Sequence, residues 1–122
     1  MSYSAYVLSQ ESREALLNTF KPTFAEAIAH HVTYAFPDDS PPPPIDEALI
    51  IGHSVNHRIE CVVVRIDGVC DRPRGGIYHI TLSLDRAQGA KPKHSNQLLK
   101  RQNWSPVEPP ISIELTPKLI KF

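Results

Sequence analysis

Apolar and polar residues alternate with a period of two between Ile77 and Asp85. This pattern predicts a β-strand with one face in the core and the other exposed. The expected core face consists of Tyr78, Ile80, Leu82 and Leu84. The opposite face carries His79, Thr81, Ser83 and Asp85.

A second strand of the same kind is predicted at 31–36, with Val32, Tyr34 and Phe36 on its apolar face. His31 and Thr33 share its polar face, so the chain carries His-x-Thr twice, 48 positions apart. We expect the two strands to lie side by side and their polar faces to form one cleft. The alternative is two unrelated surface strands on which threonine, a residue that favours strands, lies beside histidine.

Further strands are predicted at 3–8, 48–52 and 58–67, and one or two at 111–122, where Pro117 should interrupt or border the last. Ser9 and Ser95 are expected to cap two short helices, the second spanning 96–102. The predicted fold class is therefore α+β, a mainly antiparallel sheet of roughly five to seven strands in a single domain over residues 1–122.

The segment 37–44 contains five prolines and cannot pair within a sheet. It could link two domains, but the segments on either side are too small to fold alone. We therefore expect a rigid flap that leaves the end of the first His-x-Thr strand.

The chain has 13 basic and 13 acidic residues, so no overall field attracts nucleic acid or a membrane and any phosphate recognition must be local. The sequence begins without a signal-peptide pattern and contains no apolar run of transmembrane length. We expect a cytoplasmic protein that associates with no membrane and needs no obligatory protein partner.

The polar faces carry side chains suited to acid–base chemistry on a phosphate ester. Histidine has a pKa that allows it to act as a general base or a general acid near neutral pH. Thr33 and Thr81 could donate hydrogen bonds to the non-bridging phosphate oxygens as charge develops. Neither a metal nor another cofactor is expected, because His and Asp do not recur here at a spacing typical of metal ligands.

His31-Val-Thr33-Tyr and His79-Ile-Thr81-Leu resemble the paired motifs of the 2H phosphoesterase superfamily. The segment from His79 through Lys91-Pro92 and Ser95-Asn96 to Leu98-Leu99 is also similar to the cyclic phosphodiesterase module of fungal-type tRNA ligases. The resemblance implies that one cleft holds His31, Thr33, His79 and Thr81 as catalytic residues. This chain is shorter than typical members and its motif spacing is compressed, so one lobe should be trimmed.

Several residues outside the motifs are candidates for substrate binding. Arg72 and Arg74, with the amides of Gly75 and Gly76, could contact phosphate or could form a solvated turn. The resemblance implies that Lys91 and Ser95 help to hold the substrate, whereas Ser95 could instead be a plain helix cap. Tyr34 belongs to the apolar face but could stack on a base near the strand end. Of the remaining side chains, we expect His30 to face the core, His53 and His57 to lie on the surface, and Trp104 to pack.

The expected activity is metal-independent hydrolysis of a 2′,3′-cyclic phosphate on an RNA end or a small cyclic nucleotide. Two alternatives use the same cleft. The first is hydrolysis of cyclic oligonucleotide signals or of ADP-ribose cyclic phosphate, and the second is a non-catalytic module that binds RNA ends or nucleotides.

Overall fold

The computed structural model describes residues 1–101 and 104–122. Its strands are β1 (Ser2–Leu8), β2 (Glu26–Ala27), β3 (His31–Ala35), β4 (Ala48–Val55), β5 (Ile59–Ile66), β6 (His79–Leu84), β7 (Ser105–Ser112) and β8 (Leu115–Lys121). Its helices are α1 (Gln10–Phe20), α2 (His94–Arg101) and a 3₁₀ turn (Arg86–Gln88). The predicted α+β class is confirmed.

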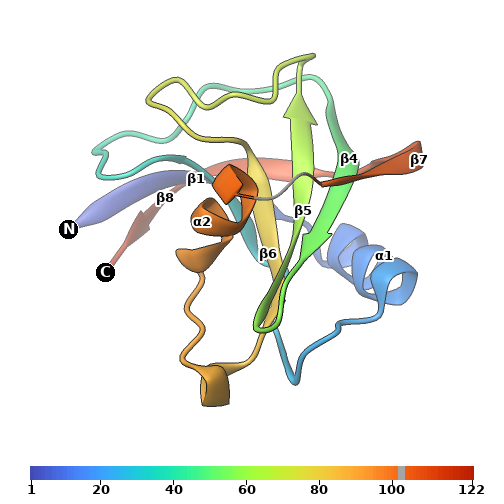
Figure 1. Cartoon of the computed structure of the whole chain (residues 1–122). Coiled ribbons are helices and arrows are strands. Elements are labelled where there is room, and N and C mark those ends of the chain that lie inside the picture. Colours follow the sequence, from blue (N-terminus) through green and yellow to red (C-terminus); the bar gives the residue numbers. More distant parts are fainter. Residues whose placement is uncertain (102–103) are drawn as a thin grey trace.

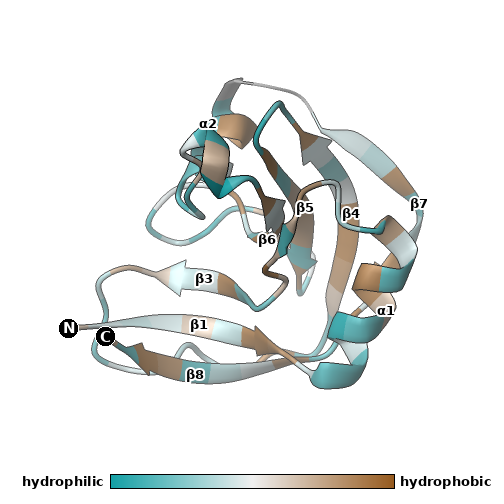
Figure 2. Cartoon of the chain, turned by 90° about the horizontal axis from the view of Figure 1, so that it is seen from below, coloured by the Kyte–Doolittle hydropathy of each residue, from teal (hydrophilic) through white to brown (hydrophobic). Residues whose placement is uncertain are grey.

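The described strands form one antiparallel sheet in the order β7-β4-β5-β6-β3-β1-β8, with β2 paired to β6 (Figure 1). In Figure 2, β8, β1 and β3 form one half, and β6, β5 and β4 form the other. The ladder that joins the halves is short, with Val32 opposite Ile80. The two His-x-Thr segments therefore lie at the junction between the halves.

Two groups of buried side chains fix the layers. The larger group includes Tyr6, Val32, Ile80 and Leu82 of the sheet together with Leu16 of α1. The smaller group lies under α2. It contains Ile59, Cys61, Leu84, Ala90 and Leu98. The sheet is thus covered by helices on two sides, and α2 covers the part of β5 and β6 next to the second His-x-Thr segment.

Local sequence signals explain the ends of α1. The hydroxyl of Ser9 accepts a hydrogen bond from the Ser12 amide at 3.1 Å, which confirms the predicted N-cap. The helix ends at Phe20, and Pro22, which lacks an amide hydrogen, follows two residues later.

The described part of the chain has one strand more than the roughly five to seven predicted, because the sequence pattern does not predict the two-residue β2. Both edge strands of the sheet, β7 and β8, contain proline. β7 contains Pro106, Pro109 and Pro110, and β8 contains Pro117, which lies opposite Tyr6 rather than interrupting the strand. An edge strand tolerates proline because the missing amide donor can belong to its unpaired side.

The structure also extends β4 beyond the predicted segment 48–52, to Val55. Gly52 lies within this strand against the ring of Trp104, where a Cβ atom would collide with the ring. The packing role predicted for Trp104 is confirmed.

The proline-rich segment 37–44 connects two strands of the same sheet, β3 and β4, so it is a loop within the fold and not a domain linker. The hydroxyl of Tyr6 donates a hydrogen bond to the Pro43 carbonyl at 2.8 Å. The Asp38 amide donates to the Ser2 carbonyl at 3.0 Å. These contacts hold the loop against β1.

Candidate active site

The two His-x-Thr segments lie on neighbouring antiparallel strands, β3 and β6. Val32 and Ile80, the middle residues of the two segments, are opposite each other and fully buried. Because side chains alternate along a strand, the histidine and threonine that flank each of them point to the other face. The prediction that the strands lie side by side is confirmed.

All four residues of the doubled motif line one cavity of about 540 Å³. The other described residues that line it are Tyr3, Ile28, Phe36, Arg72, Pro92, Lys93 and Asn96. The cavity thus combines two imidazoles and two hydroxyls with basic side chains and aromatic rings. The single cleft expected from the sequence is present.

The imidazole of His79 is oriented by its own backbone. Its Nδ1 atom lies 2.8 Å from the carbonyl oxygen of Ile77. A carbonyl can only accept, so Nδ1 carries the hydrogen and donates it. In the neutral ring Nε2 is then the nitrogen with a free lone pair, and it is the atom that can take up or release a proton.

The imidazole of His31 has two polar neighbours. Its Nδ1 atom lies 3.0 Å from Nδ1 of His30, and its Nε2 atom lies 3.5 Å from the hydroxyl of Tyr3. One of the two facing Nδ1 atoms must donate to the other, so the His30–His31 contact couples the tautomers of the two rings.

Burial, together with the neighbouring His30 and His79, lowers the pKa of His31 to about 4. Burial also lowers the pKa of His79, an effect that the Ile77 carbonyl opposes and Arg72 reinforces. Both pKa shifts favour the neutral form of the imidazoles in the free protein. A bound anion would stabilise their protonated forms and raise both pKa values.

The two threonines differ in their surroundings. The Thr81 hydroxyl is buried, 2.9 Å from the Ser95 hydroxyl and 3.4 Å from the Pro92 carbonyl. If Ser95 donates to Thr81, the hydrogen of Thr81 can turn toward a ligand. Within the described part of the chain, the Thr33 hydroxyl has no hydrogen-bond partner, so it is free to bind one.

Ser95 is not a helix cap. α2 begins at His94, so Ser95 lies in its first turn, where it is fully buried. Its hydroxyl contacts Thr81 instead of a helix-end amide. Ser95 therefore supports a cavity residue from behind, and it does not itself line the cavity.

Arg72 provides a cation at the cavity. Its Nε donates to the Gly75 carbonyl at 3.0 Å, and one terminal nitrogen donates to Oδ1 of Asn96 at 3.3 Å. Gly76 has a φ of +87°, and a Cβ atom there would lie 2.5 Å from the guanidinium. Glycine is thus required both for the turn and for the close approach of Arg72.

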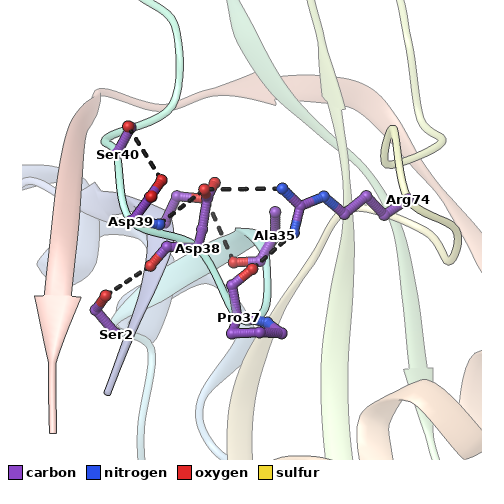
Figure 3. Close-up of polar contacts among 8 residues, drawn as sticks. Ser2, Ala35, Pro37, Asp38, Asp39, Ser40 and Arg74 are labelled. Atoms are coloured by element: carbon purple, nitrogen blue, oxygen red, sulfur yellow. Dashed lines mark hydrogen bonds and ion pairs between the residues drawn. The ribbon is translucent and has the colours of Figure 1, made fainter.

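Arg74 does not reach this cavity; it contacts the loop after β3 (Figure 3). One terminal nitrogen donates to the Pro37 carbonyl at 2.6 Å, and the other lies 3.7 Å from the Asp38 carboxylate. That carboxylate also accepts from the Ser4 hydroxyl at 2.7 Å. Arg74 therefore joins the loop before β6 to the loop after β3.

The structure does not bring Lys91 or Tyr34 to the cavity either. Lys91 is exposed, and the lysine that lines the cavity is Lys93. Tyr34 packs edge-on against Tyr6 and stacks with Tyr78 on the apolar face of the sheet. The aromatic residues at the cavity are instead Tyr3 and Phe36.

Two other histidines differ from their predictions. His30 is exposed, because Ala29, at a φ of +43°, breaks the regular alternation just before β3. His53 lies within β4, and its Nε2 is 2.7 Å from the carboxylate of the buried Glu60.

Comparison with protein-family models, curated protein sequences and solved structures found no match for this chain. Among the described residues, no three His, Cys, Asp or Glu side chains gather as metal ligands. No described helix is both long and apolar enough to cross a membrane.

Proposed function

We propose that the protein is a phosphodiesterase that opens a 2′,3′-cyclic phosphate by paired-histidine acid–base catalysis. The observation that carries the proposal is that His31, Thr33, His79 and Thr81 line one cavity. The sequence resemblance to 2H phosphoesterases supports the same assignment. These four side chains supply the acid, the base and the hydrogen-bond donors, so the proposed reaction requires no metal.

In the proposed reaction one imidazole is neutral and the other protonated. The neutral imidazole takes a proton from water as the water oxygen bonds to phosphorus. The bond from phosphorus to one ribose oxygen breaks, and the protonated imidazole gives that oxygen a proton. The products are a phosphomonoester and a free vicinal hydroxyl. The hydroxyls of Thr33 and Thr81 donate to the non-bridging oxygens, on which negative charge accumulates.

The lowered histidine pKa values predict an acid-shifted pH profile. Activity requires one proton on the histidine pair, so kcat/KM should be highest between the two pKa values of the free enzyme. One is about 4 and the other lies below 6.5. The optimum of kcat/KM should therefore lie below pH 6.5. The kcat profile should lie at higher pH, because the bound phosphate anion stabilises the imidazolium.

Initial rates between pH 4 and 9 with a 2′,3′-cyclic nucleotide, a window around the histidine pKa, test this prediction. A kcat/KM optimum above pH 7 would show that the pair is not held neutral in the free protein. A flat profile, with chemistry rate-limiting, would rule out acid–base catalysis by the pair.

A second cavity favours an RNA end over a mononucleotide as substrate. It has a volume of about 360 Å³ and shares Arg72 and Asn96 with the first. Among the described residues that line it, all the charged side chains are basic: Arg72, Arg74 and Lys100. We infer that the phosphates preceding the cyclic end of an RNA lie along this cavity, since cationic side chains provide most of the affinity for a phosphate backbone.

This inference predicts a salt-dependent preference. The kcat/KM of an oligonucleotide ending in a cyclic phosphate should exceed that of the mononucleotide and fall more steeply with salt. Lys100→Gln should reduce the log–log salt slope by about 0.7, the value for one single-strand phosphate contact. Lys118→Gln, on the edge strand β8, removes the same charge elsewhere and should not change the slope. Equal slopes for both substrates would reject the extended site.

A panel of substrates separates the proposed activity from its alternatives. The purified protein, treated with a chelator and desalted, would be given a 2′,3′-cyclic mononucleotide, an RNA with a cyclic end, a cyclic oligonucleotide and ADP-ribose cyclic phosphate. Turnover of the first two supports the proposal. Turnover confined to either of the last two would favour the alternative hydrolase, and binding without turnover would favour a binding module.

A further inference from the structure

Three aromatic rings gather at the mouth of the cavity. Tyr3 and Phe36 line it, and their ring centroids are 5.5 Å apart. Phe122 stacks on Phe36 at 5.6 Å with an interplanar angle of 21°. Phe36 and Phe122 are 57% and 64% exposed, and they are two of the four large hydrophobic side chains that are exposed among the described residues. Exposed aromatic side chains that gather beside a cavity are typical of a binding surface.

The backbone that carries Phe36 is held in place on both sides. Phe36 directly follows β3, and the next residue, Pro37, accepts the hydrogen bond from Arg74 (Figure 3). Asp38 is fixed to β1 through its contacts with Ser2 and Ser4. The ring of Phe36 is thus presented by a segment that is already ordered without a ligand, which lowers the entropic cost of binding.

The cavity has walls of different chemistry. Phe36 and Tyr3 form an aromatic wall, and Tyr3 also contacts His31, with ring centroids 5.6 Å apart. Arg72 and Lys93 make another part of the lining basic. A nucleotide has the same division, because its phosphate is anionic and its base offers a flat π-face.

We propose that Phe36, backed by Tyr3 and Phe122, stacks on the nucleobase of a nucleotide whose cyclic phosphate lies between His31 and His79. This inference rests on the proposed function and narrows its substrate class to cyclic phosphates on a base-bearing ribose. Stacking does not read the hydrogen-bonding edge of a base, so purines and pyrimidines should both be accepted. A ribose cyclic phosphate without a base would lose the contact.

The test compares a nucleoside 2′,3′-cyclic phosphate with methyl ribofuranoside 2,3-cyclic phosphate, which has the same reacting group but no base. Stacking of one base on an aromatic side chain corresponds to a preference of about 5- to 150-fold. The wild-type protein should show such a ratio of kcat/KM values. Phe36→Ala should bring the ratio close to 1, whereas Phe36→Trp should retain it.

Val69→Ala provides the matched control, because Val69 is also an exposed apolar residue but lies in the turn after β5. It should leave the ratio unchanged. A kcat/KM ratio near 1 for the wild-type protein, or an unchanged ratio for Phe36→Ala, would overturn the base-stacking proposal. Turnover of both compounds would in that case still support the proposed function.

If the folded protein hydrolyses neither compound, the proposed function fails. Binding measured by calorimetry then still tests whether Phe36 stacks on a nucleobase. A nucleoside 2′-monophosphate should then bind more tightly than methyl ribofuranoside 2-phosphate by the same factor. Phe36→Ala should abolish the difference. Equal dissociation constants for the two compounds in the wild-type protein would show that Phe36 does not stack on a nucleobase.

Discussion

Replacing either His31 or His79 by alanine should lower kcat by about 10²- to 10⁴-fold, which is the usual contribution of a positioned acid or base. Both imidazoles line the same cavity, and the Nε2 atom of His79 is the nitrogen that can exchange a proton. In the proposed mechanism each ring performs one proton transfer, and no other described residue that lines the cavity is a histidine that could replace it.

The double variant should lose far less than the product of the two single losses, because the acid and the base act as a unit. Steady-state kinetics on a cyclic nucleotide measures these effects. His57→Ala is a suitable control, since His57 is exposed in the turn between β4 and β5 and should keep full activity. Near-wild-type turnover by a folded His31→Ala or His79→Ala protein would show that the two-histidine mechanism is wrong.

Glu60→Ala should destabilise the fold by about 3–5 kcal/mol, because it removes several hydrogen bonds to a buried carboxylate and each such bond contributes about 1.5–3 kcal/mol. Glu60 is only 1% exposed. Its carboxylate accepts hydrogen bonds from Ser83 at 2.6 Å and from the Thr23 amide at 2.9 Å, and it contacts His53 at 2.7 Å. The substitution leaves these groups without their partner and creates a cavity between β4, β5 and β6.

Urea denaturation measures the change in the free energy of unfolding. Glu108→Ala on the exposed edge strand β7 is the control and should change stability by no more than about 0.5 kcal/mol. An equally small effect of Glu60→Ala would show that the buried carboxylate does not hold the strands together.

The same carboxylate gives stability a pH dependence of known sign. Burial alone would raise the pKa of Glu60, but hydrogen bonds from His53, Ser83 and Thr23 lower it to about 2, compared with 4.5 in the unfolded chain. Because the folded-state pKa is depressed, the contribution is fully present above pH 4.5. It is lost as the pH falls toward 2.

The doubled motif was predictable because its signal is local. A period of two places His31 with Thr33 and His79 with Thr81, whatever the rest of the fold does. The burial of Val32 and Ile80 confirms that placement.

Residues in turns and loops carry no such periodicity. Arg72 and Arg74 are two positions apart in one turn, yet only Arg72 lines the cavity with the two His-x-Thr segments, and Arg74 reaches across to Pro37. The difference depends on the positive φ of Gly75 and Gly76, which the sequence does not specify. The alternation predicts Phe36 on the apolar face, but β3 ends at Ala35 and the alternation ends with it, so Phe36 lies elsewhere.

Long-range packing accounts for the remaining differences. Ser95 has the sequence context of a helix cap, but α2 begins one residue earlier and places its hydroxyl against Thr81. His53 contacts Glu60, which lies on the neighbouring strand, and the sequence around His53 gives no sign of this contact. Contacts between different elements decide both positions, the helix α2 with β6 for Ser95 and β4 with β5 for His53, and the pattern along one segment does not contain them.

Hydrolysis in ¹⁸O-labelled water, followed by ³¹P NMR, tests the central claim most directly. The wild-type protein, treated with a chelator and desalted, should convert a 2′,3′-cyclic nucleotide to a phosphomonoester with one solvent oxygen on phosphorus. The folded His31→Ala/His79→Ala protein should leave the cyclic phosphate resonance unchanged over the same time. No conversion by the wild-type protein, or equal conversion by the double variant, would contradict catalysis by the paired histidines.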